Sequence, residues 1–260
     1  MTLRTFTWLL AATAACTVAV EVVSLWYAPE VGFGLVVRTG WALLRSLAFL
    51  VLIWQVRNGR AGARPFGLIL AVTTIFSVAR LVVPRHGLPA WPGIVGFAVL
   101  TLLCLSVVAV LYRSSVLDTH LVRRPARRSV PARILTARVA ALSYAPLMLV
   151  PALVAVGAVF HGQLATVPAV VAWLVVGFVV SYVVLFTTYF LLRGHRWART
   201  LVLVLSGLVL AVQLPLCWWL LGLDGLVRDG TPLVVAVALA VWGVTRSTSE
   251  DGPPMVRQGR

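Results

Sequence analysis

Long apolar runs follow one another along this chain with only short polar breaks between them. The run from 168 to 191 holds 24 residues and no charged side chain. A helix needs about 20 predominantly apolar residues to cross a hydrocarbon core of about 30 Å. The runs are continuous rather than alternating, which excludes a closed barrel, and only helices satisfy their own backbone hydrogen bonds in lipid. The sequence therefore predicts an all-α integral membrane protein.

The composition agrees with a chain whose solvent is the bilayer. Of the 260 residues, 61% are hydrophobic and 11% are charged, whereas a soluble domain carries roughly 25% charged residues. We expect about eight transmembrane helices, with ends uncertain by a few residues. The expected spans are 6–26, 38–56, 65–83, 93–112, 139–160, 168–191, 200–221 and 232–246.

The distribution of arginine predicts the orientation. The chain has 22 Arg, no Lys and seven acids, which gives a net charge of +15. Nucleic-acid binding would need these charges on one soluble face, but here they interrupt apolar runs. Seventeen fall at one side of the expected spans, and cytoplasmic loops hold such an excess. The bias predicts a multi-pass protein of a bacterial cytoplasmic membrane, with both termini cytoplasmic and no nucleic-acid partner.

The longest polar stretch divides the chain into two halves of four expected spans. Arg57-Asn58-Gly59-Arg60, before the third span, resembles Arg193-Gly194-His195-Arg196, before the seventh. Four spans in each half give both halves the same orientation, which suggests a parallel duplication. The expected units are a first membrane half 1–112, an Arg-rich cytoplasmic loop 113–138, a second membrane half 139–246 and a disordered tail 247–260.

Catalytic and metal-binding motifs are missing from the sequence. All four histidines lie in loops or at helix ends, and no H-E-x-x-H, G-x-S-x-G or phosphate-binding loop occurs. The three cysteines are far apart, each inside an apolar run, which indicates neither a disulfide framework nor a zinc site. We therefore expect no cofactor and no metal, and an enzyme is the less favoured class.

One charged cluster stands out among the first three spans. Glu21 falls in the first span and Arg45 in the second, at similar predicted depth, so an ion pair between them is geometrically plausible. Arg38, Arg80 and Arg85 add positive charge toward the same side. The structural interpretation is that Glu21 neutralises Arg45 while the other side chains reach the headgroups. The functional interpretation is an outward-facing site for a phosphate, carboxylate or lipid headgroup.

The second half holds more helix breakers than charges. Pro146 and Pro151 fall in the fifth span, and Gln213 and Pro215 in the seventh. A proline inside a helix removes a backbone donor, and the freed carbonyl can line a cavity or serve only in packing.

These observations leave three functions open. The favoured one is a non-enzymatic membrane protein, either a subunit of a larger complex or a binder of an anionic lipid or amphiphile at the Arg/Glu cluster. The second is a secondary transporter of a small solute or lipid, which needs a polar-lined cavity at mid-membrane depth. The third is a lipid-modifying enzyme using Glu21 as acid or base. This role needs a raised pKa for Glu21, whereas a nearby Arg would lower it.

Overall fold

The computed structural model describes residues 2–27, 32–79, 90–122, 131–160 and 164–248. This part of the chain is helical and contains no strand, so the all-α prediction is confirmed. The helices are α1 (Leu3–Trp26), α2 (Phe33–Arg57), α3 (Ala63–Val78), α4 (Ala90–Arg113), α5 (Ser115–Val122), α6 (Ala132–Leu142), α7 (Tyr144–Phe160), η2 (Leu164–Thr166), α8 (Val167–Leu192), α9 (Arg196–Gly225), η3 (Leu226–Gly230) and α10 (Thr231–Thr248).

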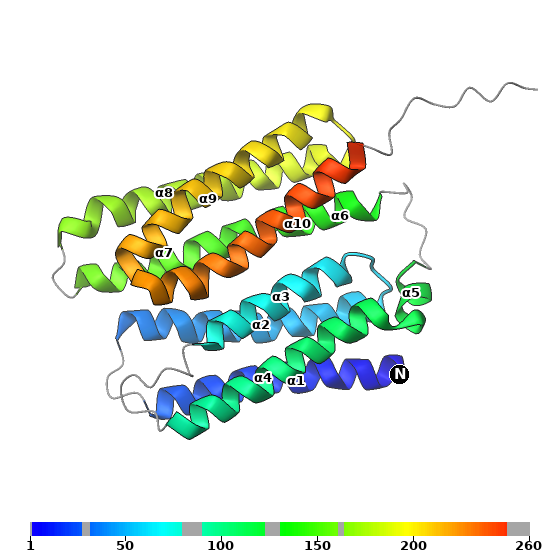
Figure 1. Cartoon of the computed structure of the whole chain (residues 1–260), viewed down its shortest axis with the longest axis horizontal. Coiled ribbons are helices and arrows are strands. Elements are labelled where there is room, and N and C mark those ends of the chain that lie inside the picture. Colours follow the sequence, from blue (N-terminus) through cyan, green and yellow to red (C-terminus); the bar gives the residue numbers. More distant parts are fainter. Residues whose placement is uncertain (1, 28–31, 80–89, 123–130, 161–163, 249–260) are drawn as a thin grey trace, which may run out of the picture.

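The helices form two bundles that lie side by side (Figure 1). Helices α1 to α5 make the first bundle and α6 to α10 the second, and each bundle has its own buried apolar core. Helices α2 and α3 pack against α6, α7 and α10 where the bundles meet. The face where α1 begins and α2 ends, on the right in Figure 1, is called the N-terminal face below, and the other is the opposite face.

Six helical segments are long and apolar enough to cross a membrane. They are Leu3–Trp26, Phe33–Arg57, Trp91–Arg113, Ala132–Gly157, Leu164–Leu192 and the continuous stretch Arg196–Arg246, which contains both α9 and α10. Helix α3 is shorter, with 16 residues. A helix therefore lies at each of the eight expected spans, and the long apolar helices fit a membrane protein.

The expected Arg-rich loop 113–138 contains two helical segments. Helix α5 occupies Ser115–Val122, and α6 begins at Ala132. Leu117 and Leu121 of α5 are buried in the first core. The Nε2 of His120 lies 3.0 Å from the Val56 carbonyl and must donate to it, because a carbonyl only accepts. This part of the loop is thus folded onto the end of α2.

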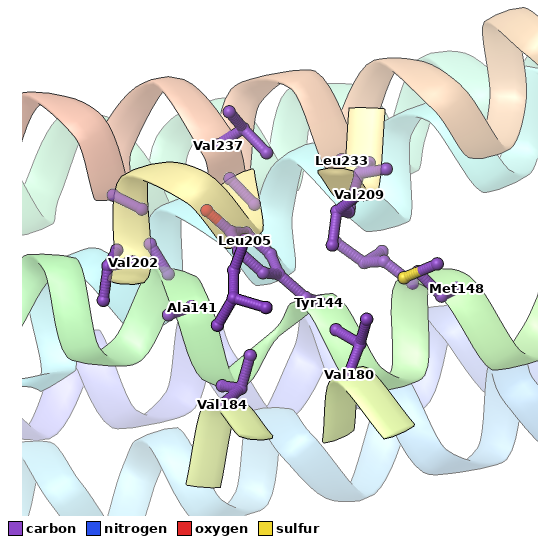
Figure 2. Packing of buried hydrophobic residues seen from close by; sticks show 14 of the residues in the cluster. Ala141, Tyr144, Met148, Val180, Val184, Val202, Leu205, Val209, Leu233 and Val237 are labelled. Atoms are coloured by element: carbon purple, nitrogen blue, oxygen red, sulfur yellow. The ribbon is translucent and has the colours of Figure 1, made fainter. Parts of the chain in front are cut away.

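The core of the second bundle lies where α6, α7, α8, α9 and α10 converge (Figure 2). Tyr144 is fully buried there, and its hydroxyl lies 2.8 Å from that of Ser206. Because Ser206 donates to the Val202 carbonyl at 2.7 Å, the Tyr144 hydroxyl is the donor toward Ser206. Each hydroxyl is therefore satisfied within the apolar core, as buried polar groups require.

The end of the chain partly departs from the expected tail. Helix α10 continues to Thr248, so the first two residues of the predicted tail 247–260 are helical. The remaining tail lies outside the described residues.

Candidate functional site

Arg45 lies at the centre of helix α2. The helix starts at Phe33, five residues before the expected start of the span, so Trp41 lies two turns inside it rather than at its outer end. Arg45 is the middle residue of this 25-residue helix, about 18 Å from either end at 1.5 Å per residue. The side chain is buried, with 4% of its surface exposed. A charge at this depth is costly in lipid and is usually functional or paired.

Glu21 lies nearer the opposite face than Arg45 does. It is also buried, and one carboxylate oxygen accepts a hydrogen bond from the Thr39 hydroxyl at 3.2 Å. Thr39 precedes Arg45 by six residues, or about 9 Å along the axis of α2. Arg38, which is half-buried, is therefore the Arg of α2 at the level of Glu21. The Glu21–Arg45 ion pair stays a prediction, and Arg80 and Arg85 lie outside the described residues.

Arg45 lies on the same side of α2 as Phe49 and Leu52 of the first core, and it also borders the space between the bundles. Its Nη1 donates to the Thr74 carbonyl of α3 at 3.4 Å, a long contact. The side chain also lines a cavity of about 420 Å³ between the bundles. The first bundle contributes Trp41, Leu44, Arg45, Ala48, Gln55, Phe66, Ile69, Leu70 and Thr73 to its wall.

The second bundle closes the cavity with the junction of α6 and α7. Its lining residues there are Val139, Leu142, Ser143, Pro146 and Leu147. Pro146 has no N–H to donate to the Leu142 carbonyl four residues earlier. The helix is interrupted at Ser143, between α6 and α7. The cavity therefore lies beside this interruption in the fifth expected span.

A second proline in α7 is compensated from another helix. Pro151 removes the donor that the Leu147 carbonyl would receive in a regular helix. The side-chain amide of Gln213 in α9 donates to that carbonyl at 3.1 Å, and its oxygen accepts from the indole N–H of Trp173 at 2.8 Å. Gln213 and Trp173 are both fully buried. This network holds α7, α8 and α9 together directly behind the cavity.

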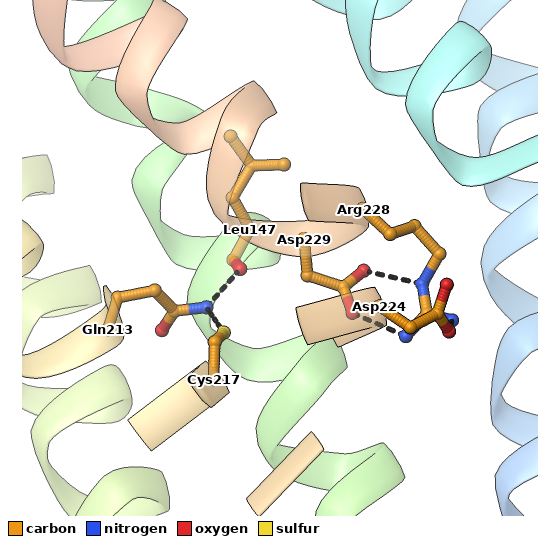
Figure 3. Close-up of polar contacts among 6 residues, drawn as sticks. All are labelled: Leu147, Gln213, Cys217, Asp224, Arg228 and Asp229. Atoms are coloured by element: carbon orange, nitrogen blue, oxygen red, sulfur yellow. Dashed lines mark hydrogen bonds and ion pairs between the residues drawn. The ribbon is translucent and has the colours of Figure 1, made fainter. Parts of the chain in front are cut away.

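An ion-pair cluster lies at the turn between α9 and α10 (Figure 3). Arg228 binds Asp229 through two nitrogens, at 3.2 and 2.6 Å, and Asp224 through a third at 3.2 Å. Only 5% of Arg228 is exposed. A smaller cavity lined by Arg228 and Asp229 shares Trp41 and other wall residues with the main one. Charged groups from both bundles therefore meet around the same interface.

The expected spans 200–221 and 232–246 leave this turn between two helices, and the structure keeps the connecting segment helical. The chain bends at Gly222, whose φ of 70° lies in the left-handed region, and then passes through η3, a π-helical turn. The spacing of Asp224 and Arg228 is the four-residue spacing of a helical ion pair. That spacing was the signal in the sequence that could have revealed the cluster.

The fold and this site together define a class: a polytopic α-helical protein with a mostly apolar cavity between two bundles, bordered by one buried arginine. No protein family, curated protein or solved structure matches the chain. Among the described residues, no group of three or more His, Cys, Asp or Glu side chains is placed to hold a metal ion.

Proposed function

We propose that this protein binds an anionic amphiphile in the cavity between its bundles, with Arg45 as the counter-charge. The observation that carries the proposal is a buried arginine, halfway along its helix, in the wall of a cavity of about 420 Å³. Ligand sites commonly measure about 300–1,000 Å³ and combine apolar walls with a few polar groups. The site differs from the outward-facing cluster expected from the sequence. Of the cluster residues that the structure describes, Arg45 lines the cavity, and Glu21 and Arg38 do not.

The chemistry of the walls suits a carboxylate or phosphate with an apolar tail. A guanidinium binds either group through two parallel hydrogen bonds. Thr73 and Ser143 place hydroxyls in the same wall, and most of the other lining residues are apolar. A low-dielectric surrounding strengthens the attraction between Arg45 and an anion, and the tail gains by leaving water. An anionic head group gains a contact with the guanidinium that a neutral hydrocarbon lacks, so the site favours anionic ligands.

Further support comes from a proposed topology of eight spans in two parallel halves. The Arg residues of the helix ends gather at the N-terminal face, which we assign to the cytoplasm of a bacterial cell. Gly59 and Gly194, in the two similar Arg-rich turns, both have a left-handed φ, of 63° and 82°. Each turn thus has an arginine at either end and one left-handed glycine, at its third position before α3 and at its second before α9. The cavity then lies between the two halves.

The test is quenching of Trp41, which lines the cavity. A bromine-labelled long-chain fatty acid is titrated into the purified protein in detergent, and Trp41→Phe identifies the part of the quenching that arises at the cavity. Arg45→Gln should weaken this binding by about tenfold, since a charge-assisted hydrogen bond contributes about 1.5–3 kcal/mol. Arg60→Gln is the matched control, because Arg60 is exposed and stacks on Trp54 at 4.1 Å.

The outcome that contradicts the proposal is quenching that Trp41→Phe leaves unchanged. If Arg45→Gln does not fold, Ser143→Phe gives an independent test, because a bulky ring fills the cavity without removing its charge. That variant should abolish the Trp41-dependent quenching while the protein keeps its helical circular dichroism.

A secondary transporter is the second candidate, and the position of the cavity favours it. Transporters bind their substrates near mid-membrane depth between repeated halves, beside interrupted helices. Here the cavity lies between the bundles, with Arg45 at the centre of α2 and the α6–α7 break in its wall. Proteoliposomes loaded with a radiolabelled fatty acid would separate the two functions. Protein-dependent movement across the bilayer that is lost in Arg45→Gln indicates transport, and binding without movement indicates a binding protein.

A further inference from the structure

A groove on the outside of the second bundle is separate from the cavity between the bundles. It runs along α8, has a volume of about 700 Å³, and includes Arg138 of α6 together with Tyr182, Leu185, Phe186 and Tyr189 of α8 in its wall. The four α8 side chains are all more than half exposed. In a membrane protein, a surface of this kind faces lipid rather than water.

Arg138 gives the groove a positive charge whose Nε has no hydrogen-bond partner among the described residues. It is half-buried, and its Nε is shielded from solvent while making no hydrogen bond to any described residue. A shielded guanidinium N–H that donates to nothing is costly. None of the described residues that line the groove is acidic, so the described wall carries no counter-charge for Arg138.

The end of the groove nearest the N-terminal face carries further positive charge and aromatic rings. The guanidinium of Arg193 stacks over the Tyr189 ring at 4.4 Å, and Arg193 is exposed. Trp197 packs against Phe190, with ring centroids 5.1 Å apart. Amphipathic aromatic rings gather at the level of lipid headgroups. This end of the groove therefore lies at the membrane interface, where a phosphate would be found.

We propose that the groove is a binding site for one anionic phospholipid. The phosphate accepts hydrogen bonds from Arg138, with Arg193 adding attraction from the rim, and an acyl chain lies along Tyr182, Leu185 and Phe186. The charge decides the class of lipid: two arginines without an acid attract a lipid with net negative charge, while a zwitterionic headgroup would bring its own ammonium close to both guanidinium groups. The site does not depend on the proposed function of the cavity.

The experiment compares lipid retention by native mass spectrometry. The intact protein is reconstituted into vesicles of phosphatidylcholine containing one fifth phosphatidylglycerol, extracted in mild detergent, and its bound lipids are identified by mass. We expect one retained phosphatidylglycerol per chain, enriched about tenfold over its share of the vesicle, the ratio that about 1.4 kcal/mol of preference produces. Arg138→Gln should remove this enrichment.

Two control variants make the result specific. Arg196→Gln removes an exposed charge from the same corner but not from the groove wall, and it should leave the enrichment unchanged. Arg45→Gln tests the other cavity and should also leave the enrichment unchanged, so failure of the proposed function is distinguishable from failure of this site. Equal loss in Arg138→Gln and Arg196→Gln would show only general charge attraction and would overturn the proposal. So would a dimer with no retained lipid, because a second copy would then occupy the groove.

Discussion

At the scale of single residues, the polar groups of the second bundle are arranged to compensate for its prolines. Pro151 leaves the Leu147 carbonyl without its helical donor, and Gln213 supplies one from α9. The other end of the same amide satisfies Trp173. The Gln213 side chain therefore completes two hydrogen bonds, to the Leu147 carbonyl and to the Trp173 N–H, in a fully buried place. Interhelical hydrogen bonds in membranes are modest, averaging about 0.6 kcal/mol with a maximum near 1.7, so the network stabilises packing rather than dominating it.

We predict that Gln213→Leu lowers the free energy of unfolding by about 1–3 kcal/mol, because the Leu147 carbonyl and the Trp173 N–H both lose their partner. Adding Pro151→Ala restores a backbone N–H for Leu147 and should recover about half of the loss. Reversible unfolding in mixed micelles measures both effects. Gln55→Leu, at a half-buried position in the cavity wall, is the matched control and should change stability by no more than about 0.5 kcal/mol. Additive effects of the two changes would refute the compensation.

At the scale of helices, small residues let α6 and α10 approach closely. A Cβ added at Gly243 of α10 would lie 2.6 Å from the Arg133 carbonyl oxygen and 3.0 Å from the Ala137 Cβ. Ala240 and Ala236 continue this surface one and two turns earlier, and both are fully buried. Small side chains are typical of tightly packed membrane helices, because van der Waals contact replaces the hydrophobic effect there.

Gly243→Ala should therefore force α6 and α10 apart and cost about 1–3 kcal/mol, the usual range for overpacking. The control is Gly207→Ala in α9, where an added Cβ meets nothing within 4 Å. That change should stabilise the protein by about 0.5–1 kcal/mol, since Gly is a poor helix former. Thermal unfolding of the two variants in one detergent gives the comparison. Similar midpoints for both would mean that the α6–α10 contact is looser than described.

At the scale of the whole molecule, the alternating helices bring the ends of the described chain to one face. Helix α1 begins and α10 ends at the N-terminal face, on the right in Figure 1, and η2 lies at the opposite face. Arg57, Arg113, Arg193 and Arg246 all stand at helix ends on the N-terminal face. The proposed orientation places this face in the cytoplasm.

Cysteine labelling tests that orientation. In a background with Cys16, Cys104 and Cys217 replaced by Ala, Leu164→Cys in η2 should react with a membrane-impermeant maleimide on intact cells, because Leu164 is 71% exposed. Arg196→Cys, at an exposed position on the N-terminal face, should react only after the membrane is permeabilised. The opposite pattern would reverse the assigned orientation, and labelling of both on intact cells would contradict the proposed topology.

The sequence by itself determined the helical class and the approximate helix positions. Continuous apolar runs leave no other way to satisfy the backbone in lipid. Each expected span overlaps helical segments of the structure, although the fifth is interrupted at Ser143 and the end of the third lies outside the described residues. Arg45 was also identified from sequence, because a charge inside an apolar run is conspicuous. The helix that holds Arg45 starts at Phe33 rather than at the expected residue 38, so Arg45 lies deeper than the expected span implies.

Only the tertiary structure decided which face of each helix packs and which side chains meet. Val179 is 55% exposed and Val180 is 1% exposed, although the two residues are identical and adjacent. Lipid tails are as apolar as a protein core, so both faces of a membrane helix carry the same kinds of residue and no periodicity marks the buried side. For the same reason the sequence showed Gln213, Pro151, Arg228 and Asp229 as separate features. Their contacts, and the cavity beside Arg45, depend on how the two bundles pack.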